Sequence, residues 1–284
     1  MANSGRKVRT IYIGGGTPTT LSNAQMQLLM ETIHSAFDLS RCIEFTVEGG
    51  RPDTLNAEKL ATIARCGADR MSINPQTMVD SVLKASARPH TAADVLRAYQ
   101  EAEDAGFKAI NMDLIAGLPG DNFATFARSF DQILDLNPEN ITVHTFCVKK
   151  AADIVQQSDV YSRHGGDAGK CVDYTQICAP KRGYVPYYMY RQKNTVGNFE
   201  NVGFAHPGTE GRYNIYMMEE YHSIFAAGAG AVTKVVDYRP DSGKSPLIDR
   251  YFNHKYPFEY LRDHGQDDKI AFIEKFYEER GLLG

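Results

Sequence analysis

The residues best suited to bind a ligand follow the first predicted strand, residues 8–13. The segment Val8-Arg9-Thr10-Ile11-Tyr12-Ile13 has the β-branched, alternating pattern of a strand, and Gly14-Gly15-Gly16-Thr17-Pro18 follows it directly. Glycines let the backbone turn sharply and leave its N–H and C=O groups open to a closely approaching ligand. The junction therefore predicts a main-chain binding site, for example for the amino-acid end of a cofactor. A tight strand-to-loop turn is the alternative.

Further polar residues stand at the ends of other predicted strands. Glu48 follows strand 43–47 and precedes a Gly-Gly-Arg-Pro-Asp turn. Gln76 follows strand 69–73. Asp113 lies inside the otherwise apolar strand 109–115, just before Gly117-Leu118-Pro119-Gly120. An unpaired carboxylate is costly to bury, so Asp113 indicates a function, whereas Glu48 could also be a solvated charge.

These residues need a scaffold, and strand and helix patterns alternate from residue 8 to about residue 147. Strands 8–13, 43–47, 69–73, 109–115 and 141–146 are separated by helices 25–37, 57–65, 91–105 and 122–135, the first of them capped by Ser22. Strict alternation predicts a parallel sheet with helices outside it and right-handed crossovers. Without a Gly-x-Gly-x-x-Gly motif, part of a (β/α) barrel fits at least as well as a doubly wound sheet. In a barrel, the carboxyl ends of the strands bind ligands.

After residue 148 the pattern changes. Residues 151–170 are polar and predict a loop, followed by a helix over about 168–182 and an aromatic-rich strand over 184–190. Residues 236–250 predict a linker, and 267–281 a charged terminal helix. We therefore expect three parts: a partial barrel (1–150), an extension that completes the barrel region (151–235), and a linker with a C-terminal helix (236–284).

Composition limits the class of protein. The chain has 284 residues, of which 43% are hydrophobic and 23% charged, and it contains no apolar run near the roughly 20 residues that a membrane helix needs. The first residues have no apolar segment of the signal-peptide kind. A net charge of −4 without a long basic block argues against a nucleic-acid-binding surface. We expect a cytoplasmic protein with no membrane span.

The five cysteines show no spacing typical of a metal site. They are Cys42, Cys66, Cys147, Cys171 and Cys178. An odd number in a chain without a signal argues against a disulfide framework, and no metal ligands are predicted. His144, at the inner end of strand 141–146, is expected to be a satisfied histidine rather than a ligand.

Taken in order, these motifs resemble a known family. Gly14-Gly15-Gly16-Thr17-Pro18, Val47-Glu48, Asn74-Pro75-Gln76-Thr77, Arg88 and Asn111-Met112-Asp113-Leu114-Ile115-Ala116-Gly117-Leu118-Pro119-Gly120 resemble radical S-adenosylmethionine (SAM) enzymes of the oxygen-independent coproporphyrinogen III oxidase (HemN-like) family. Tyr187-Tyr188-Met189-Tyr190-Arg191-Gln192-Lys193-Asn194 and Gly197-Asn198-Phe199-Glu200-Asn201-Val202-Gly203 are similar to its HemZ branch. The resemblance covers nearly the whole chain. It implies an α/β fold, a partial (β/α)6 TIM-like radical SAM barrel that lacks its first βα unit, with a C-terminal α+β extension.

The resemblance also implies a [4Fe–4S] cluster, which this sequence does not provide for. The family holds the cluster with Cys-x-x-x-Cys-x-x-Cys after the first strand, and no such triplet occurs here. By resemblance the chain begins in the helix after that strand, so the ligands are expected upstream. Three explanations would account for the missing ligands: the sequence is a fragment, its reading frame starts late, or it is a degenerate relative. We favour a fragment because the other motifs are intact. Without three thiolates this polypeptide alone cannot hold the cluster in the family's way.

Roles for several residues follow from the resemblance. Those matching positions that contact SAM are Gly14, Gly15, Gly16, Thr17, Glu48, Gln76, Arg88 and Asp113. The glycine strand edge would meet the methionyl amino group, Gln76 and Asp113 the ribose, and Arg88 the carboxylate. For Arg88 a surface salt bridge is the alternative.

The aromatic block predicts a pocket for an amphipathic tetrapyrrole with several carboxylates. Its candidate residues are Tyr188, Tyr190, Arg191, Lys193 and Phe199. Aromatic side chains would form the walls and Arg191 would be the best carboxylate partner. The tyrosines could equally belong to the core and surface of a strand.

The implied reaction is the oxidative decarboxylation of two propionates of coproporphyrinogen III to vinyl groups through a 5′-deoxyadenosyl radical. The product would be protoporphyrinogen IX, in haem biosynthesis, and no side chain of this chain would act as a nucleophile. The expected partners are the tetrapyrrole and an electron donor for the cluster. A haem- or tetrapyrrole-binding chaperone on the same scaffold, another radical SAM reaction, and an inactive chain remain alternatives.

Overall fold

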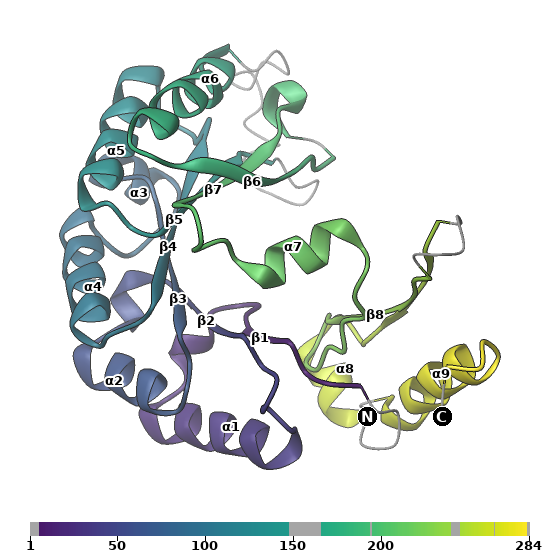
Figure 1. Cartoon of the computed structure of the whole chain (residues 1–284). Helices are drawn as coiled ribbons and strands as arrows, with labels where there is room; N and C mark the ends of the chain where they lie inside the picture. The colour runs from purple at the N-terminus through teal and green to yellow at the C-terminus, as the bar shows by residue number, and fades with distance from the viewer. Residues whose placement is uncertain (1–5, 148–165, 194, 240–244, 264, 283–284) are drawn as a thin grey trace. The chain divides into compact units, whose positions relative to one another are not determined.

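Five parallel strands separated by helices form the first part of the chain, as the alternating pattern predicts. They are β1 (Thr10–Ile13), β2 (Glu44–Gly50), β3 (Arg70–Gln76), β4 (Ala109–Ala116) and β5 (Asn140–Thr145), each paired in parallel with the next. The computed structural model in Figure 1 describes residues 6–147, 166–193, 195–239, 245–263 and 265–282. Most of the loop predicted over 151–170 lies outside these described residues.

Helices cover one face of this sheet. Figure 1 shows them in a row along its outside: α1 (Asn23–Ala36), α2 (Ala57–Arg65), α4 (Ala92–Asp104), α5 (Phe123–Leu136) and α6 (Gly166–Lys181). The short helix α3 (Asp80–Ala85) follows β3. The predicted cap of the first helix is confirmed, because Ser22 Oγ accepts from Gln25 N (3.2 Å) while Gln25 Oε1 accepts from Ser22 N (2.9 Å).

Alternation along the strands separates an apolar face from a polar one. Met71 and Ile73 of β3, and Met112 of β4, are fully buried in the core between sheet and helices. The intervening residues, among them Asn74 and Asp113, point to the opposite face. The helices thus bury one face of the sheet, and the other is left to polar side chains.

Two further strands extend the sheet in antiparallel fashion. β6 (Val185–Tyr190) and β7 (Asn201–Ala205) give the order β1-β2-β3-β4-β5-β7-β6, in which β7 runs antiparallel to both neighbours. A connection of about ten residues between β6 and β7 favours a hairpin, since a parallel pair needs a longer crossover. The result is a seven-stranded half-barrel, and the predicted partial TIM-like α/β fold is confirmed.

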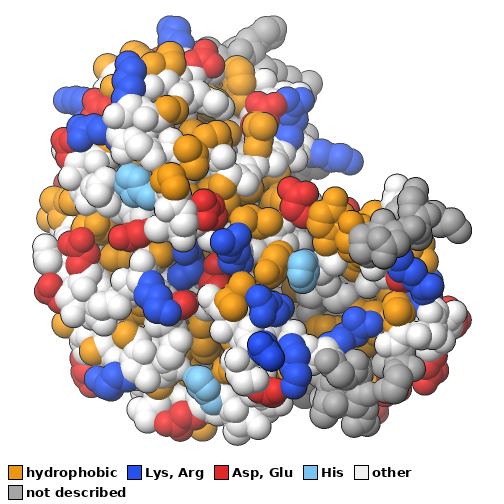
Figure 2. Space-filling view, viewed as in Figure 1, with side chains coloured by type: hydrophobic (Ala, Val, Ile, Leu, Met, Phe, Trp, Pro, Cys, Tyr) orange, Lys and Arg blue, Asp and Glu red, His pale blue; other side chains and the backbone are white. Residues whose placement is uncertain are grey.

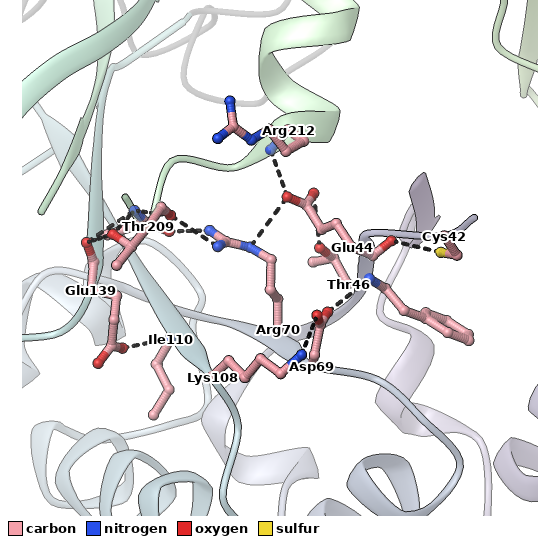
Figure 3. Close-up of polar contacts among 12 residues, drawn as sticks. Cys42, Glu44, Thr46, Asp69, Arg70, Lys108, Ile110, Glu139, Thr209 and Arg212 are labelled. Atoms are coloured by element: carbon pink, nitrogen blue, oxygen red, sulfur yellow. Dashed lines mark hydrogen bonds and ion pairs between the residues drawn. The ribbon is translucent and has the colours of Figure 1, made fainter. Parts of the chain in front are cut away.

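The amino ends of the strands are joined by a buried polar network (Figure 3). Arg70, at the start of β3, pairs with Glu44 of β2 (Nε to Oε2, 3.7 Å). It also donates to the Thr209 carbonyl (2.9 Å) and to Asn140 Oδ1 of β5. Glu44 in turn accepts from the Arg212 backbone N–H (2.5 Å). This network fixes the segment after β7 at the amino ends of the strands. The predicted binding residues lie at the opposite, carboxyl ends.

A second compact unit follows residue 212. The chain divides into Val8–Arg212 and a unit made of Met1–Lys7 with Tyr213–Gly284. The divisions expected at 150/151 and 235/236 do not coincide with this boundary. Helix α7 (Arg212–Glu219) begins there, and β8 (Val232–Asp237), β9 (Leu247–Phe252), α8 (Pro257–Arg262) and α9 (Gln266–Glu278) follow.

The second unit has a small core of its own. Val235 packs with Phe276 and Tyr277, which are nearly inaccessible to solvent. The segment 236–250, expected to be a linker, instead contains the end of β8 and part of β9, which pair as an antiparallel hairpin. The predicted terminal helix corresponds to α9. Leu247–Phe252 is a short strand that follows a polar stretch of the sequence, and its alternating pattern is therefore easily missed.

The surface shows mixed charge. In the left-hand part of Figure 2, basic and acidic side chains are interspersed on the face seen there. No helix in the described ranges combines the length and the apolar character that crossing a bilayer demands.

Candidate ligand-binding site at the carboxyl ends of the strands

Glu48 of β2 lies beside the glycine loop that follows β1. Its Oε2 accepts from the Gly15 backbone N–H (3.4 Å) and the Tyr12 hydroxyl (3.4 Å), and its Oε1 accepts from Asn74 Nδ2 (3.5 Å). Burial raises the pKa of the Glu48 carboxyl, and the negative charge of Asp113 raises it further. These contacts are long, so Glu48 has weak partners and can accept stronger hydrogen bonds from a cationic or hydroxyl ligand.

The glycines of this loop are required by space and by backbone conformation. A Cβ on Gly14 would lie 2.3 Å from Tyr12 Cε1 and 2.8 Å from Glu48 Oε2, so a side chain does not fit there. Gly15 (φ +76°) and Gly16 (φ +56°) have left-handed backbones, and a Cβ on either would meet open space. Thr17 precedes the 3₁₀ turn η2 (Pro18–Thr20). The loop therefore presents bare backbone beside Glu48, which fits a ligand carrying an amino group.

Asp113 of β4 connects this region to the antiparallel strands. Its Oδ1 accepts from Asn111 Nδ2 (2.7 Å), and its Oδ2 lies 3.7 Å from His144 Nε2 of β5. Its negative charge contributes to the raised pKa of Glu48 and of Tyr190. Asp113 is thus the electrostatic centre of the polar face of the sheet.

Two of the predicted tyrosines lie next to it. The Tyr190 hydroxyl is 3.3 Å from His144 Nδ1, and the Tyr188 hydroxyl is 3.3 Å from Thr142 Oγ1. The two rings are nearly parallel, with centroids 6.3 Å apart. Burial raises the pKa of both phenols, so they are neutral hydrogen-bonding groups near neutral pH. Together they form an aromatic surface at the edge of the site.

Gln76 ends β3 in an unusual conformation. Its backbone is left-handed (φ +69°), and the pairing of β3 with β4 shifts between Ile73 and Gln76. The residue is 7% exposed, and its side-chain Oε1 is buried without a hydrogen-bond partner. A buried unpaired acceptor is costly, which fits a site where a ligand hydroxyl or amine supplies the donor.

Arg88 follows α3 and is half-buried. Burial lowers the pKa of its guanidinium, and the positive charge of Arg51 acts in the same direction. Arg51 itself is paired with Asp53 (2.5 Å). Within the described part of the chain, no ion pair to Arg88 occurs, so the salt bridge considered as an alternative is not found there. Arg88 retains its capacity to bind a carboxylate.

The other predicted tetrapyrrole-binding residues lie apart from this group. Arg191 is exposed and forms an ion pair with Glu200, and Lys193 is also exposed. Phe199 packs against Gly169 of α6 and against the hydrophobic core on the helical side of the sheet. Their roles in substrate binding stay predictions that the observed contacts do not favour.

Several residues of the site have no role in the sequence analysis. Besides His144, they are Tyr12, Ser72, Asn74, Asn111 and Thr142. Ser72 joins two of them, because its Oγ donates to Asn74 Oδ1 (3.0 Å) and accepts from Asn111 Nδ2 (2.9 Å). Their common signal is position, since they alternate with apolar residues along β1, β3, β4 and β5, which include or flank the strands of Glu48 and Asp113.

The described residues do not fit a [4Fe–4S] cluster. Across those ranges, no group of three or more His, Cys, Asp or Glu side chains is placed to hold a metal ion, and the five cysteines are free thiols. Because thiolates are the usual cluster ligands, no chemical step is assigned to a cluster on these residues.

Comparison with known proteins identifies relatives of this chain. The model of the radical SAM superfamily matches residues 1–133. The chain is 41% identical to the oxygen-independent coproporphyrinogen-III oxidase-like protein HemZ of Bacillus subtilis over 96% of its length, and 31% identical to the haem chaperone HemW of the same organism over 78%. It spans 54% and 56% of those two proteins, about half of each.

A solved structure shows the same fold. The Escherichia coli coproporphyrinogen III oxidase HemN, described as a radical SAM enzyme, superposes with a TM-score of 0.68 at 20% identity, covering 91% of this chain and 58% of HemN. Fold, motif order and sequence similarity agree. The chain therefore belongs to the radical SAM superfamily, within the HemN-like family of oxygen-independent coproporphyrinogen III oxidases, in its HemZ branch.

Proposed function

We propose that this chain forms the SAM-binding half-barrel of a protein that acts on a tetrapyrrole. The observation that supports this most directly is the convergence of Glu48, Asp113 and Tyr190 from three different strands on one polar face of the sheet. Two carboxylates with few strong partners suit a ligand rich in amino and hydroxyl donors. The adjacent phenol suits an aromatic, partly polar second ligand.

Three parts of the cofactor have a matching group in the site. The Gly14–Gly16 backbone and Glu48 would hold the methionyl amino group, and Arg88 its carboxylate. Asp113 and the unpaired Oε1 of Gln76 would accept from the ribose hydroxyls. Bound SAM, once reductively cleaved, supplies the hydrogen-abstracting group of this chemistry. The residues of this chain bind and orient it, and none is proposed as a nucleophile.

For the whole protein we propose oxidative decarboxylation of coproporphyrinogen III to protoporphyrinogen IX. The 41% identity to HemZ and the fold shared with HemN support it. Tyr188 and Tyr190 would contact the tetrapyrrole beside the cofactor. The reaction also needs a cluster and its electron donor, and the described residues provide no ligands for that cluster.

A haem chaperone is the second candidate. It is favoured by the 31% identity to HemW, which spans 78% of this chain. To distinguish the two, coproporphyrinogen III and haem are offered anaerobically to the protein expressed from its complete gene and reconstituted with iron and sulfide. Vinyl-bearing products in the presence of SAM and a reductant indicate the oxidase. Stoichiometric haem binding without decarboxylation indicates the chaperone.

Cofactor binding is tested by calorimetric titration of the chain with SAM. Asp113→Asn should raise the Kd by about 10- to 100-fold, since a hydrogen bond to a charged group contributes about 1.5–3 kcal/mol. The matched control is Asp135→Asn, because Asp135 forms an exposed ion pair with Arg182 on the outer helices. Absence of saturable binding, or equal affinity of both variants, would refute the assignment.

A further inference from the structure

The left-handed backbone of Gln76 must be held by its surroundings. An L-residue in this conformation costs on the order of 1–2 kcal/mol, and the preceding residue, Pro75, has no N–H to contribute to the sheet. The Pro75 carbonyl accepts instead from His90 Nε2 at 3.1 Å. That hydrogen bond fixes the peptide group immediately before Gln76.

His90 is well suited to be a fixed donor. It is 2% exposed, and its Nδ1 is buried without a partner. A carbonyl oxygen can only accept, so the proton resides on Nε2 and Nδ1 holds a lone pair. Burial lowers the pKa of His90, and the charge of Arg88 acts in the same direction, so the ring remains neutral near neutral pH.

The segment that carries His90 is itself fixed at each end. The Arg88 N–H donates to the Leu83 carbonyl (2.9 Å) at the end of α3. The Ala92 N–H donates to Asp80 Oδ1 (2.8 Å), and Thr91 caps α4. The His90–Pro75 hydrogen bond therefore links this anchored segment, which includes Arg88, to the end of β3, which includes Gln76.

We propose that His90 is a positioning residue that sets the distance and orientation between Gln76 and Arg88, so that both can contact one SAM molecule. This rests on the function proposed above. His90 would not touch the cofactor, and it would act through the Pro75–Gln76 peptide and the short segment that it shares with Arg88.

The test compares His90→Leu with His90→Gln by calorimetric titration of the chain with SAM. Leucine removes the donor, so the Kd should rise about tenfold, whereas Gln can place its Nε2 near the position of the imidazole Nε2 and should keep the Kd within about threefold. In a Gln76→Ala background, His90→Leu should weaken binding by a clearly smaller factor, because one of the two groups it positions is already missing.

A matched control is available on the helical side of the sheet. His34 Nε2 lies 2.8 Å from the Cys66 carbonyl, so His34→Leu removes a histidine–carbonyl contact of the same type. That variant should leave the Kd unchanged. If the parent chain binds SAM but His90→Leu binds equally well, or if His34→Leu weakens binding as much, the positioning role is refuted. If the parent chain does not bind SAM at all, the proposed function itself fails.

A second measurement is independent of the cofactor. Nitrogen-15 NMR of the histidine rings should show His90 as the neutral Nε2–H tautomer in the free protein. A mobile or charged His90 would also overturn the proposal.

Discussion

Replacing Arg70 by methionine should destabilise the half-barrel strongly. Arg70 holds the network at the amino ends of the strands (Figure 3), with its side chain 13% exposed and that of its partner Glu44 4% exposed. Methionine retains much of the apolar stem and removes the charge and the donors. The substitution removes the ion pair with Arg70 from the buried Glu44 carboxylate.

The size of the expected loss of stability follows from the interactions that each group loses. Removing one partner of a buried ion pair costs about 3–5 kcal/mol. Glu44 would keep the Arg212 N–H (2.5 Å) and the Thr46 hydroxyl (3.4 Å). The Thr209 carbonyl would keep Asn140 Nδ2 (3.0 Å) as a donor. The lower end of the range therefore applies, and we expect a loss of about 3 kcal/mol.

Hydrogen exchange is the suitable assay, because the chain has two compact units and no tryptophan, so a single unfolding transition cannot be assumed. Peptides from β2 to β5 are followed by mass spectrometry. A loss of about 3 kcal/mol should accelerate exchange of the most protected amides roughly a hundredfold.

The control uses an ion pair on the surface of the same unit. Arg182 pairs with Asp135 at 2.6 Å, with the two side chains 53% and 67% exposed, so Arg182→Met should cost less than about 1 kcal/mol. The Arg70→Met effect should also decrease in a Glu44→Gln background, where the ion pair with Arg70 is already absent. Equal effects of the two arginine substitutions, or an unchanged effect in that background, would refute the reasoning.

Two further predictions concern the site. Gly203→Ala should destabilise the β6–β7 hairpin by about 1–3 kcal/mol, because the new Cβ would lie 1.8 Å from Tyr188 Cε1. Hydrogen exchange measures this loss of stability. It should show no such loss when the same substitution is made in a Tyr188→Ala background, where the clash is absent. SAM affinity should decrease as pH falls through the pKa of Glu48, which lies above its ordinary 4.5, since only the ionised carboxylate attracts the ammonium group. Asp113→Asn should move this decrease to lower pH by removing a repulsive charge, and calorimetry that shows pH-independent affinity would contradict the assignment.

The strand and helix order was accessible from the sequence because it depends on local patterns. Ser22 predicted a helix start that a capping box confirms. The glycines after β1 and the carboxylate inside β4 marked the carboxyl ends of strands, where a parallel sheet brings distant residues together. The cofactor roles proposed for these residues came from the family resemblance, because the spacing of residues in the sequence does not indicate which ligand they bind.

Residues 184–203 show where local pattern was insufficient. The strand over 184–190 was predicted, but its antiparallel partner β7 and the position of Tyr188 over Gly203 depend on pairing between strands. By composition alone Phe199 could line a pocket or fill the core, and its packing against Gly169 and the edge of the core is visible only in the fold. Arg191 likewise pairs with Glu200, which lies nine residues away in the sequence. The residue type of Arg191 alone does not predict this partner.

The sequence by itself determined the five strands of the first part of the chain, their order, and which residues stand at their carboxyl ends, because periodicity and glycine conformations are local properties. Only the tertiary structure decided which of those side chains meet. The contact of His144 with Asp113 and Tyr190, and the His90 hydrogen bond behind Gln76, join residues on separate elements. Such contacts are set by strand register and loop closure, which arise only when the whole sheet is assembled.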